Sequence, residues 1–484
     1  MLFNSGEFLI FLTVVWVLHW WIVPRSERWQ NALLLAASLV FYALSDLQFL
    51  ALLLASSLIN HALALHLVRL PEGRARSTWF WLGVSFNLGL LIYFKYANFF
   101  VEAMAQMFAS MGLASGGFVL AVLLPLGISF YTFQMLGYLI NVQHEEIDPC
   151  KNRLNFLTYV FFFPKILAGP IERAQHFLPQ IEVPRVLDPE LISDGLRQIL
   201  WGLFAKVVIA DELGPYIDTV FGAPDAHGSG TILGAVMLYI VQIYCDFSGY
   251  SNIALGVAKL FGIRLVINFA YPLFAVDISD FWRKWHVSLT SWMIDHVFTP
   301  LSFILRDMGK RGLVIAISVT FFCVGIWHGA NWTYVVFGIL QSIYFIPLAV
   351  GAGIGRASVN SSTALLPAPG RALRMLGMFV LMSFTFALLR AGSLGSMANI
   401  YQSMVINFPL NSGKQWSTMP LARDLILYII VLLCVEWIQR GKEHGLVWER
   451  LRVPKLVRFA VYLVIAQLVI WKSGMGNNFI YFQF

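Results

Sequence analysis

A single histidine lies in the longest uncharged stretch of this sequence. Between Leu313 and Gly355 there is no Asp, Glu, Lys or Arg, so His328 is the one readily protonated side chain in a segment that reads as membrane-embedded. Polar groups at membrane depth are costly and usually face a cavity or a partner, which makes an ionisable one a candidate functional residue. The alternative is a structural histidine that hydrogen-bonds a neighbouring carbonyl.

The position of His328 suggests the chemistry. At ~1.5 Å per residue from Leu313 it lies about 24 Å into the segment, less than a hydrocarbon thickness of roughly 30 Å. A neutral imidazole there can act as general base for an acceptor hydroxyl that attacks an acyl thioester. Asn331 can orient the reactants or stabilise the oxyanion. The residues leave open whether His328 is a general base or a transient acyl carrier.

A second cluster, DFWRKWH at 280–286, mixes aromatic and charged side chains. If it is helical, Trp282 and His286 share a face, and Asp280 reaches Lys284 four residues on. The alternation is typical of a helix along the membrane interface, where Trp is enriched and basic side chains reach lipid phosphate.

This cluster has a functional interpretation and a simple one. In the functional one, Arg283 and Lys284, flanked by Trp282 and Trp285, hold an anionic phosphate or thioester carrier, that is, the acyl donor. In the simple one, the helix only anchors the protein to lipid.

Composition defines the class of protein. Of 484 residues, 58% are hydrophobic and 12% charged, and the mean hydropathy is +0.72. Soluble domains carry about 25% charged residues, so the sequence predicts an all-α polytopic membrane protein. The net charge of +7 comes from scattered Lys and Arg, which favours contact with anionic lipid over nucleic acid.

A spanning helix needs about 20 mostly apolar residues, and this rule predicts about ten to twelve crossings. The candidate segments are 8–23, 31–44, 49–68, 79–96, 118–142, 232–246, 312–327, 332–349, 373–389, 425–438 and 456–471, with an amphipathic segment at 196–221. Segment 8–23 follows Glu7 and lacks a basic leader, so we expect it to stay as the first membrane helix.

Three segments are apolar yet interrupted by Pro, Gly or charge, at 125–134, 161–173 and 244–256. Broken helices at membrane depth are tolerated where they line a water-filled cavity or are buried in protein. We therefore expect re-entrant elements around a central polar funnel. The polar side chains expected to line it are Gln134, Lys165, Asp246 and Ser248. The alternative is a set of turns outside the membrane.

Several functions find no support in the sequence. The four cysteines are dispersed and three lie in apolar runs, so neither a disulfide scaffold nor a metal site is predicted. There is no Walker-type phosphate loop and no Gly-x-Ser-x-Gly elbow, so neither ATP-driven nor α/β-hydrolase chemistry is indicated.

Five motifs together resemble the membrane-bound O-acyltransferase family, and most closely its bacterial alginate O-acetyltransferase-type branch. They are PLGISFYTFQ (125–134), FFPKILAGPIER (162–173), QIYCDFSGYSNIALG (242–256), DFWRKWHVSLTSW (280–292) and WHGANW (327–332), and the closing FIYFQF (479–484) adds to them. The likeness covers roughly residues 125–349, the expected core of a single integral-membrane domain over 1–484.

The resemblance implies a many-helix fold around a funnel, with an active-site histidine at His328 and a second catalytic motif histidine at His286. It implies a bacterial inner-membrane enzyme that moves acyl groups from a cytoplasmic donor towards an extracytoplasmic polysaccharide, commonly with a periplasmic partner acyltransferase. The segment at 292–303 lacks the Leu-Gly-Gly of the alginate enzymes, so the resemblance supports polysaccharide acetylation and leaves open whether the polysaccharide is alginate.

The leading hypothesis is O-acetylation of an exported or cell-surface polysaccharide. Acetyl-coenzyme A, or another acyl thioester, is the donor substrate, and no bound cofactor is expected. One alternative is D-alanyl transfer to teichoic acid from a carrier protein. A different class is a non-catalytic transporter of an acyl or glycan carrier, for which His328 makes and breaks no bond.

Overall fold

A computed structural model of the chain describes all residues except 2, 113–121, 352–365, 409–422, 449–452 and 474–484. The chain divides into two compact units. Unit 1 comprises Met1–Ser193 with Val257–Val266, and unit 2 comprises Asp194–Gly256 with Ile267–Phe484. Helices are the only regular secondary structure in the part of the chain that is described.

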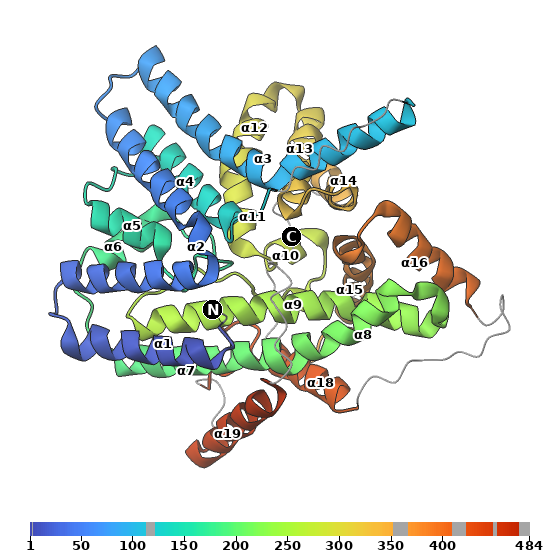
Figure 1. The fold of residues 1–484 in the computed structure, drawn as a ribbon. Coiled ribbons are helices and arrows are strands. Elements are labelled where there is room, and N and C mark those ends of the chain that lie inside the picture. Colours follow the sequence, from blue (N-terminus) through green and yellow to red (C-terminus); the bar gives the residue numbers. More distant parts are fainter. Residues whose placement is uncertain (2, 113–121, 352–365, 409–422, 449–452, 474–484) are drawn as a thin grey trace. The chain divides into compact units, whose positions relative to one another are not determined.

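Unit 1 contains six α-helices, labelled in Figure 1. They are α1 (Gly6–Val17), α2 (Glu27–Leu67), α3 (Arg74–Ser110), α4 (Ile128–Gln143), α5 (Arg153–Phe161) and α6 (Ala174–Ile181). A π-helical turn over Leu18–Ile22 extends α1.

Unit 2 holds most of the remaining helices. They are α8 (Asp211–Gly222), α10 (Ile278–Trp282), α11 (Val287–Met293), α12 (Thr299–Ile304), α13 (Lys310–His328), α14 (Trp332–Gly351), α15 (Pro369–Arg390), α16 (Leu394–Ile406), α18 (Arg423–Ile438) and α19 (Lys455–Lys472). The described part of unit 2 also has two π-helical segments, Phe204–Ala210 and Ile294–Phe298, and three short 3₁₀ turns, Pro224–Ala226, Pro272–Phe274 and Arg306–Met308. Helices α7 (Pro189–Leu203) and α9 (Ser229–Leu260) run across the boundaries between the units.

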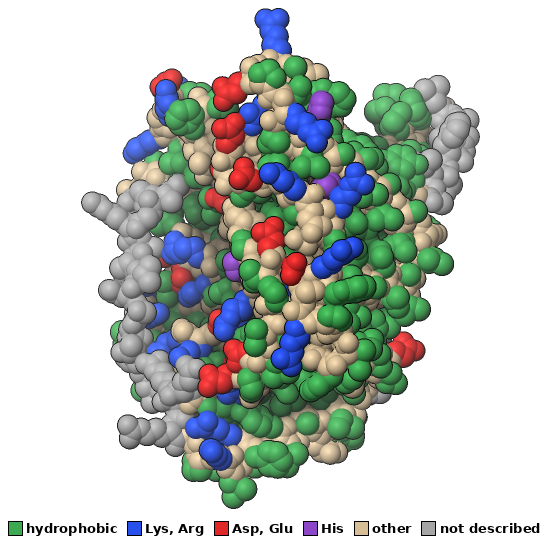
Figure 2. All heavy atoms as spheres, turned by 90° about the vertical axis from the view of Figure 1, so that its left-hand side faces the viewer, with side chains coloured by type: hydrophobic (Ala, Val, Ile, Leu, Met, Phe, Trp, Pro, Cys, Tyr) green, Lys and Arg blue, Asp and Glu red, His purple; other side chains and the backbone are tan. Residues whose placement is uncertain are grey.

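Six of the described helices are long and apolar enough to cross a membrane: α2, α3, α9, α13, α14 and α15. The predicted all-α, multi-pass membrane architecture is confirmed, while the number of ten to twelve crossings stays a prediction. In the most apolar stretch of each helix, 78% of α9 is buried inside the protein, against 28% for α2 and 22% for α3. Figure 2 shows a face on which charged side chains form a band beside extensive hydrophobic surface, the distribution of a protein exposed to both water and lipid.

Two predicted spans, 31–44 and 49–68, form the single helix α2 with a kink between them. Asp46 leaves the helical conformation (φ −160°, ψ 75°), and its Oδ2 accepts a hydrogen bond of 3.1 Å from the Leu126 amide. The Tyr42 hydroxyl donates to the Leu126 carbonyl at 3.1 Å. The kink thereby supplies partners for an irregular segment that precedes α4.

The first two interrupted segments pack against each other in unit 1. Gly127 has φ 75°, and a Cβ there would lie 2.4 Å from the Ile166 carbonyl oxygen, so only glycine fits this turn. Helix α4 begins at Ile128, so 125–134 is irregular only at its start. Segment 161–173 contains no helix after Phe161, as the sequence predicts.

The prediction that the third segment, 244–256, is an interrupted helix is wrong. Residues 244–256 are helical throughout and belong to the continuous α9. Glycines bring α9 close to α7: a Cβ at Gly249 would lie 2.8 Å from the Gly202 oxygen, and one at Gly256 would lie 2.5 Å from the Gly195 oxygen. The two pairs repeat every seven residues, so the helix backbones approach along a shared face.

Candidate active site

His328 is the last residue of α13, and a helical hairpin fixes its position. A Cβ at Gly325 would lie 2.4 Å from the Tyr334 oxygen, and one at Gly338 would lie 2.4 Å from the Phe321 oxygen, so α13 and α14 are in backbone contact. Gly329 follows the last helical residue in an extended conformation, and a Cβ there would lie 2.2 Å from the Tyr334 ring, so glycine fits this position.

His286 lies in the turn between α10 and α11, in the left-handed region with φ 44°. Few residues other than glycine adopt this conformation, which costs about 1–2 kcal/mol. Backbone pairing holds the turn, because the Val287 amide donates to the Asn268 carbonyl at 2.9 Å and the Ala270 amide donates to the Lys284 carbonyl at 3.0 Å.

Asn268 also fixes the orientation of the His286 ring. Its Oδ1 lies 2.9 Å from His286 Nδ1 and accepts from the Ser288 hydroxyl at 2.8 Å, while its Nδ2 donates to the Ser251 hydroxyl at 3.2 Å. Since Oδ1 is an acceptor, the neutral ring carries its proton on Nδ1. Burial, and secondarily the charge of a protonated His328, lower the pKa of His286 well below its ordinary value.

The two motif histidines flank one indole. The ring centroid of Trp327 lies 5.2 Å from that of His286 and 5.1 Å from that of His328. Phe247 lies 4.7 Å from His286, and Phe337 lies 5.5 Å from His328. His286 is 0% exposed and His328 4%. The structure thus gathers two imidazoles within an aromatic enclosure; we call His286, Trp327 and His328 the histidine centre.

The prediction of one helix through the cluster at 280–286 is wrong. Helix α10 ends at Trp282 and α11 begins at Val287, because His286 breaks the helical path. Both tryptophans are buried: Trp282 donates from Nε1 to Gln341 Oε1 at 3.0 Å, and Trp285 stacks on Phe281 at 5.5 Å. Their rings contribute to the protein core and do not face lipid.

The basic pair of the same segment lies nearer the surface. Arg283 is exposed and donates to the Ser279 hydroxyl at 2.6 Å. Lys284 Nζ lies 2.9 Å from Asp280 Oδ2, which confirms the predicted pairing at a spacing of four. Charged groups in this setting remain accessible to a ligand.

Asn331 has structural contacts on both sides of its amide. Its Oδ1 accepts from the Thr333 amide at 3.1 Å at the start of α14, and its Nδ2 donates to the Gly392 carbonyl at 2.7 Å. These contacts hold the turn that follows His328.

Asp246 belongs to a second polar group of unit 2. Lys206 Nζ lies 2.5 Å from Asp246 Oδ1 and 2.7 Å from Asp211 Oδ1, and all three side chains are buried. We call Lys206, Asp211 and Asp246 the charged triad. Ser248, two residues after Asp246, is buried as well.

Gln134 and Lys165, also expected to line the funnel, belong to unit 1. Gln134 Nε2 donates to the Tyr159 carbonyl at 2.8 Å. Lys165 Nζ lies 4.6 Å from the centre of the Tyr159 ring and 5.0 Å from that of Phe177. An ammonium over aromatic faces is a favourable cation–π arrangement. Both residues are integrated into the interior of unit 1.

The sequence did not indicate Asn268 or the role of Lys206. Asn268 precedes His286 by 18 residues and Lys206 precedes Asp246 by 40, and no helical spacing connects either pair. Among the described residues, no three His, Cys, Asp or Glu side chains are arranged to hold a metal ion.

Comparison with known proteins agrees with this geometry. Residues 151–389 match the profile of the membrane-bound O-acyltransferase family, and this match includes both histidines. With the relatives described below, it shows that the chain belongs to this family, as the resemblance predicts. The protein is therefore an O-acyltransferase that crosses the membrane several times.

Individual relatives refine the likeness. The chain is 32% identical to the protein of Azotobacter vinelandii named "Probable alginate O-acetylase", over 89% of this chain and 84% of that protein. It is 29% identical to the peptidoglycan O-acetyltransferase of Helicobacter pylori, over 84% and 80% of the two chains. It is 30% identical to the teichoic acid D-alanyltransferase of Streptococcus thermophilus, over 45% of this chain and 55% of that protein.

Proposed function

We propose that this protein transfers an acetyl group from a thioester donor towards the hydroxyl groups of an exported or cell-surface polysaccharide. The observation that carries the proposal is the histidine centre inside the family-matched region. The relatives that match over most of this chain are named for O-acetylation, and this favours acetyl as the group transferred.

In the proposed reaction His328 is the general base. The acceptor oxygen forms a bond to the thioester carbonyl carbon, and the hydroxyl proton passes to His328. The carbon–sulfur bond then breaks, and the proton moves from His328 to the departing thiolate. Base catalysis of this kind contributes typically about 10²–10⁴-fold to rate.

His286 supports His328 without contacting substrate, because its ring is enclosed by Phe247 and Trp327. A neutral His286 leaves no competing charge beside the base. Asn331 acts as an orienting residue, since its contacts hold the turn after His328.

We assign the donor to the surface of segment 280–286. Arg283 and Lys284 supply two positive charges that match the phosphates of acetyl-coenzyme A. Trp282 and Trp285 support this segment from the core through Gln341 and Phe281. The donor approaches from the cytoplasm in this proposal, and the protein lies in the bacterial inner membrane.

After the step at His328, the acetyl group in this proposal reaches the polysaccharide through a periplasmic partner acyltransferase. D-alanyl transfer to teichoic acid is the competing assignment. The D-alanyltransferase match covers under half of this chain, whereas the matches to the Azotobacter vinelandii and Helicobacter pylori proteins each cover more than four fifths. This difference favours acetylation.

Labelled-donor transfer tests the proposal. Membranes from the producing bacterium, with and without the gene, are incubated with acetyl-labelled coenzyme A or with labelled D-alanine, ATP and cytosol. Label from the acetyl donor is expected in polysaccharide as a base-labile ester, only when the gene is present. Gene-dependent incorporation of D-alanine alone would overturn the assignment.

A further inference from the structure

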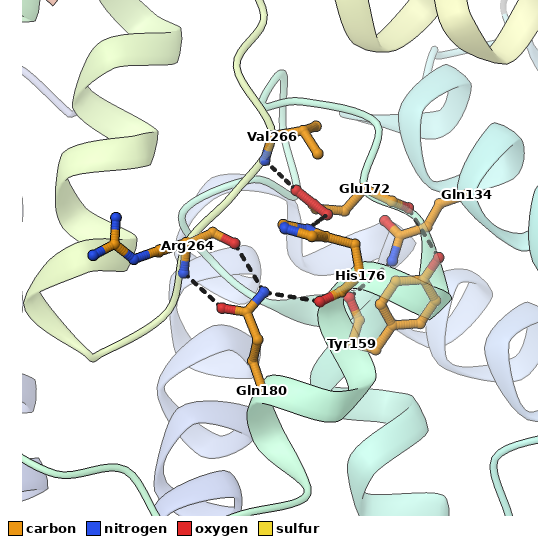
Figure 3. Close-up of polar contacts among 7 residues, drawn as sticks. All are labelled: Gln134, Tyr159, Glu172, His176, Gln180, Arg264 and Val266. Carbon is orange, nitrogen blue, oxygen red and sulfur yellow. Dashed lines mark hydrogen bonds and ion pairs between the residues drawn. The ribbon is translucent and has the colours of Figure 1, made fainter. Parts of the chain in front are cut away.

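The motif at 162–173 contains a buried carboxylate that the proposed reaction does not use. Glu172 is 1% exposed, yet both carboxylate oxygens have partners (Figure 3). Oε1 accepts from the Val266 amide at 2.5 Å, and Oε2 lies 2.9 Å from His176 Nδ1. The hydroxyl of Tyr159 donates to the Glu172 carbonyl at 2.9 Å, which fixes the backbone of the same residue.

A second side chain holds the same stretch of backbone. Gln180 Oε1 accepts from the Arg264 amide at 2.8 Å, and its Nε2 donates to the Arg264 carbonyl at 3.0 Å (Figure 3). The Gln180 amide thus satisfies both the backbone N–H and the backbone carbonyl of Arg264. With Glu172, it gives residues 264–266 three hydrogen bonds to fixed side chains.

This stretch leads directly to the histidine centre along the chain. Residues 264–267 contain no helix, and Asn268, the residue that binds His286 Nδ1, is two positions after Val266. Two extended residues span at most about 7 Å. Only Ile267 separates this fixed stretch from Asn268 along the chain.

We propose that Glu172 and Gln180 are positioning residues for the histidine centre: they fix residues 264–266, and this places Asn268 against His286. The inference rests on the proposed function only because its effect is measured as a change in the rate of acyl transfer. It gives the Pro/Gly-interrupted motif a role in aligning His286, separate from lining a funnel.

The side chains predict an ordered set of variants. Gln180→Ala removes two of the three hydrogen bonds while leaving the buried carboxylate. Glu172→Ala removes the third, and Glu172→Gln keeps an oxygen that can accept from the Val266 amide. Small misplacements near reacting groups cost up to about 10²-fold in rate. We expect Gln180→Ala and Glu172→Ala to lower kcat about tenfold or more at unchanged donor KM, and Glu172→Gln to restore most of it.

Hydrogen exchange gives a readout that does not depend on activity. The Val266 and Arg264 amides should exchange faster in Glu172→Ala and Gln180→Ala respectively. Glu182→Ala is the matched control, because this exposed carboxylate directly follows the same short helix, and it should change neither exchange nor kcat.

A double-mutant cycle separates positioning from general stabilisation. If Gln180 acts through Asn268, then Gln180→Ala lowers kcat in the wild-type background and has no further effect in Asn268→Ala. Equal losses in both backgrounds would overturn the proposal, and so would an unchanged kcat in Gln180→Ala despite faster exchange. Failure of the proposed function is distinguishable, because then His328→Ala itself would leave acyl transfer intact.

Discussion

The histidine centre and the charged triad are both buried in unit 2, and they meet the cost of burial in different ways. The charged triad places one ammonium between two carboxylates at 2.5 and 2.7 Å. The histidine centre holds the His286 imidazole with the Asn268 amide and places both imidazoles beside the Trp327 ring. Removing one partner of a buried ion pair is strongly destabilising, whereas an imidazole base is suited to taking up and releasing a proton. We therefore expect the triad to stabilise the fold and the centre to carry out the proposed chemistry.

The largest expected effect separates the two groups by activity. His328→Ala and His328→Gln should lower acyl transfer by about 10²–10⁴-fold, because the hydroxyl loses its base. Membrane levels and thermal unfolding should stay near wild type. Acetyl transfer assays on matched amounts of folded protein check this, and wild-type transfer in either variant would contradict the assigned chemistry.

The complementary effect is on stability. Lys206→Met leaves two buried carboxylates without their common partner, which should destabilise the fold by about 3–5 kcal/mol. A triple change that also makes Asp211→Asn and Asp246→Asn should recover much of the loss, because no buried charge remains. Unfolding in detergent measures both. A stable but inactive Lys206→Met would instead place the triad in the reaction.

The pH dependence of stability should have opposite signs in the two groups. Burial raises the pKa of Asp211 to about 7 in the folded protein, from 3.8 in the unfolded chain. The stability that protonated Asp211 contributes is therefore fully present below pH 3.8 and is lost as pH rises towards 7. The pKa of His286 is lowered, so its contribution is present above 6.5 and is lost as pH falls.

Two variants separate these contributions in unfolding experiments across pH. In Asp211→Asn, the free energy of unfolding should fall less between pH 4 and 7, the range set by the two pKa values of Asp211. His286→Gln should flatten the loss on acidification. A pH profile that neither variant changes would contradict the difference between the groups.

The smallest effect concerns the surface beside the histidine centre. Arg283→Ala with Lys284→Ala should raise the donor KM more than it lowers kcat. Stability should change by no more than about 1 kcal/mol, because the Asp280–Lys284 pair is partly exposed. Steady-state kinetics with acetyl-coenzyme A measures this, and an unchanged donor KM would leave the pair as lipid anchors.

The sequence identified residues whose local pattern is unusual and missed those defined by distant contacts. The sequence singles out His328 because no Asp, Glu, Lys or Arg occurs in its segment, and its role in the reaction stays a prediction. Asn268 was not, because only the folded turn brings it to His286. Trp282 and Trp285 were predicted at the interface because alternating aromatic and basic residues suit an interface and a protein core equally; the structure decides by burying them. Asp246 suggested an interrupted helix because its partner Lys206 is remote in sequence.

The close fit of Gly329 under the Tyr334 ring limits how this chain can change over time. Any side chain at position 329 would overlap that ring, and the same ring lies 6.5 Å from His328. An alanine or serine at position 329 therefore requires the Tyr334 ring to move, and that movement would take place beside the proposed base.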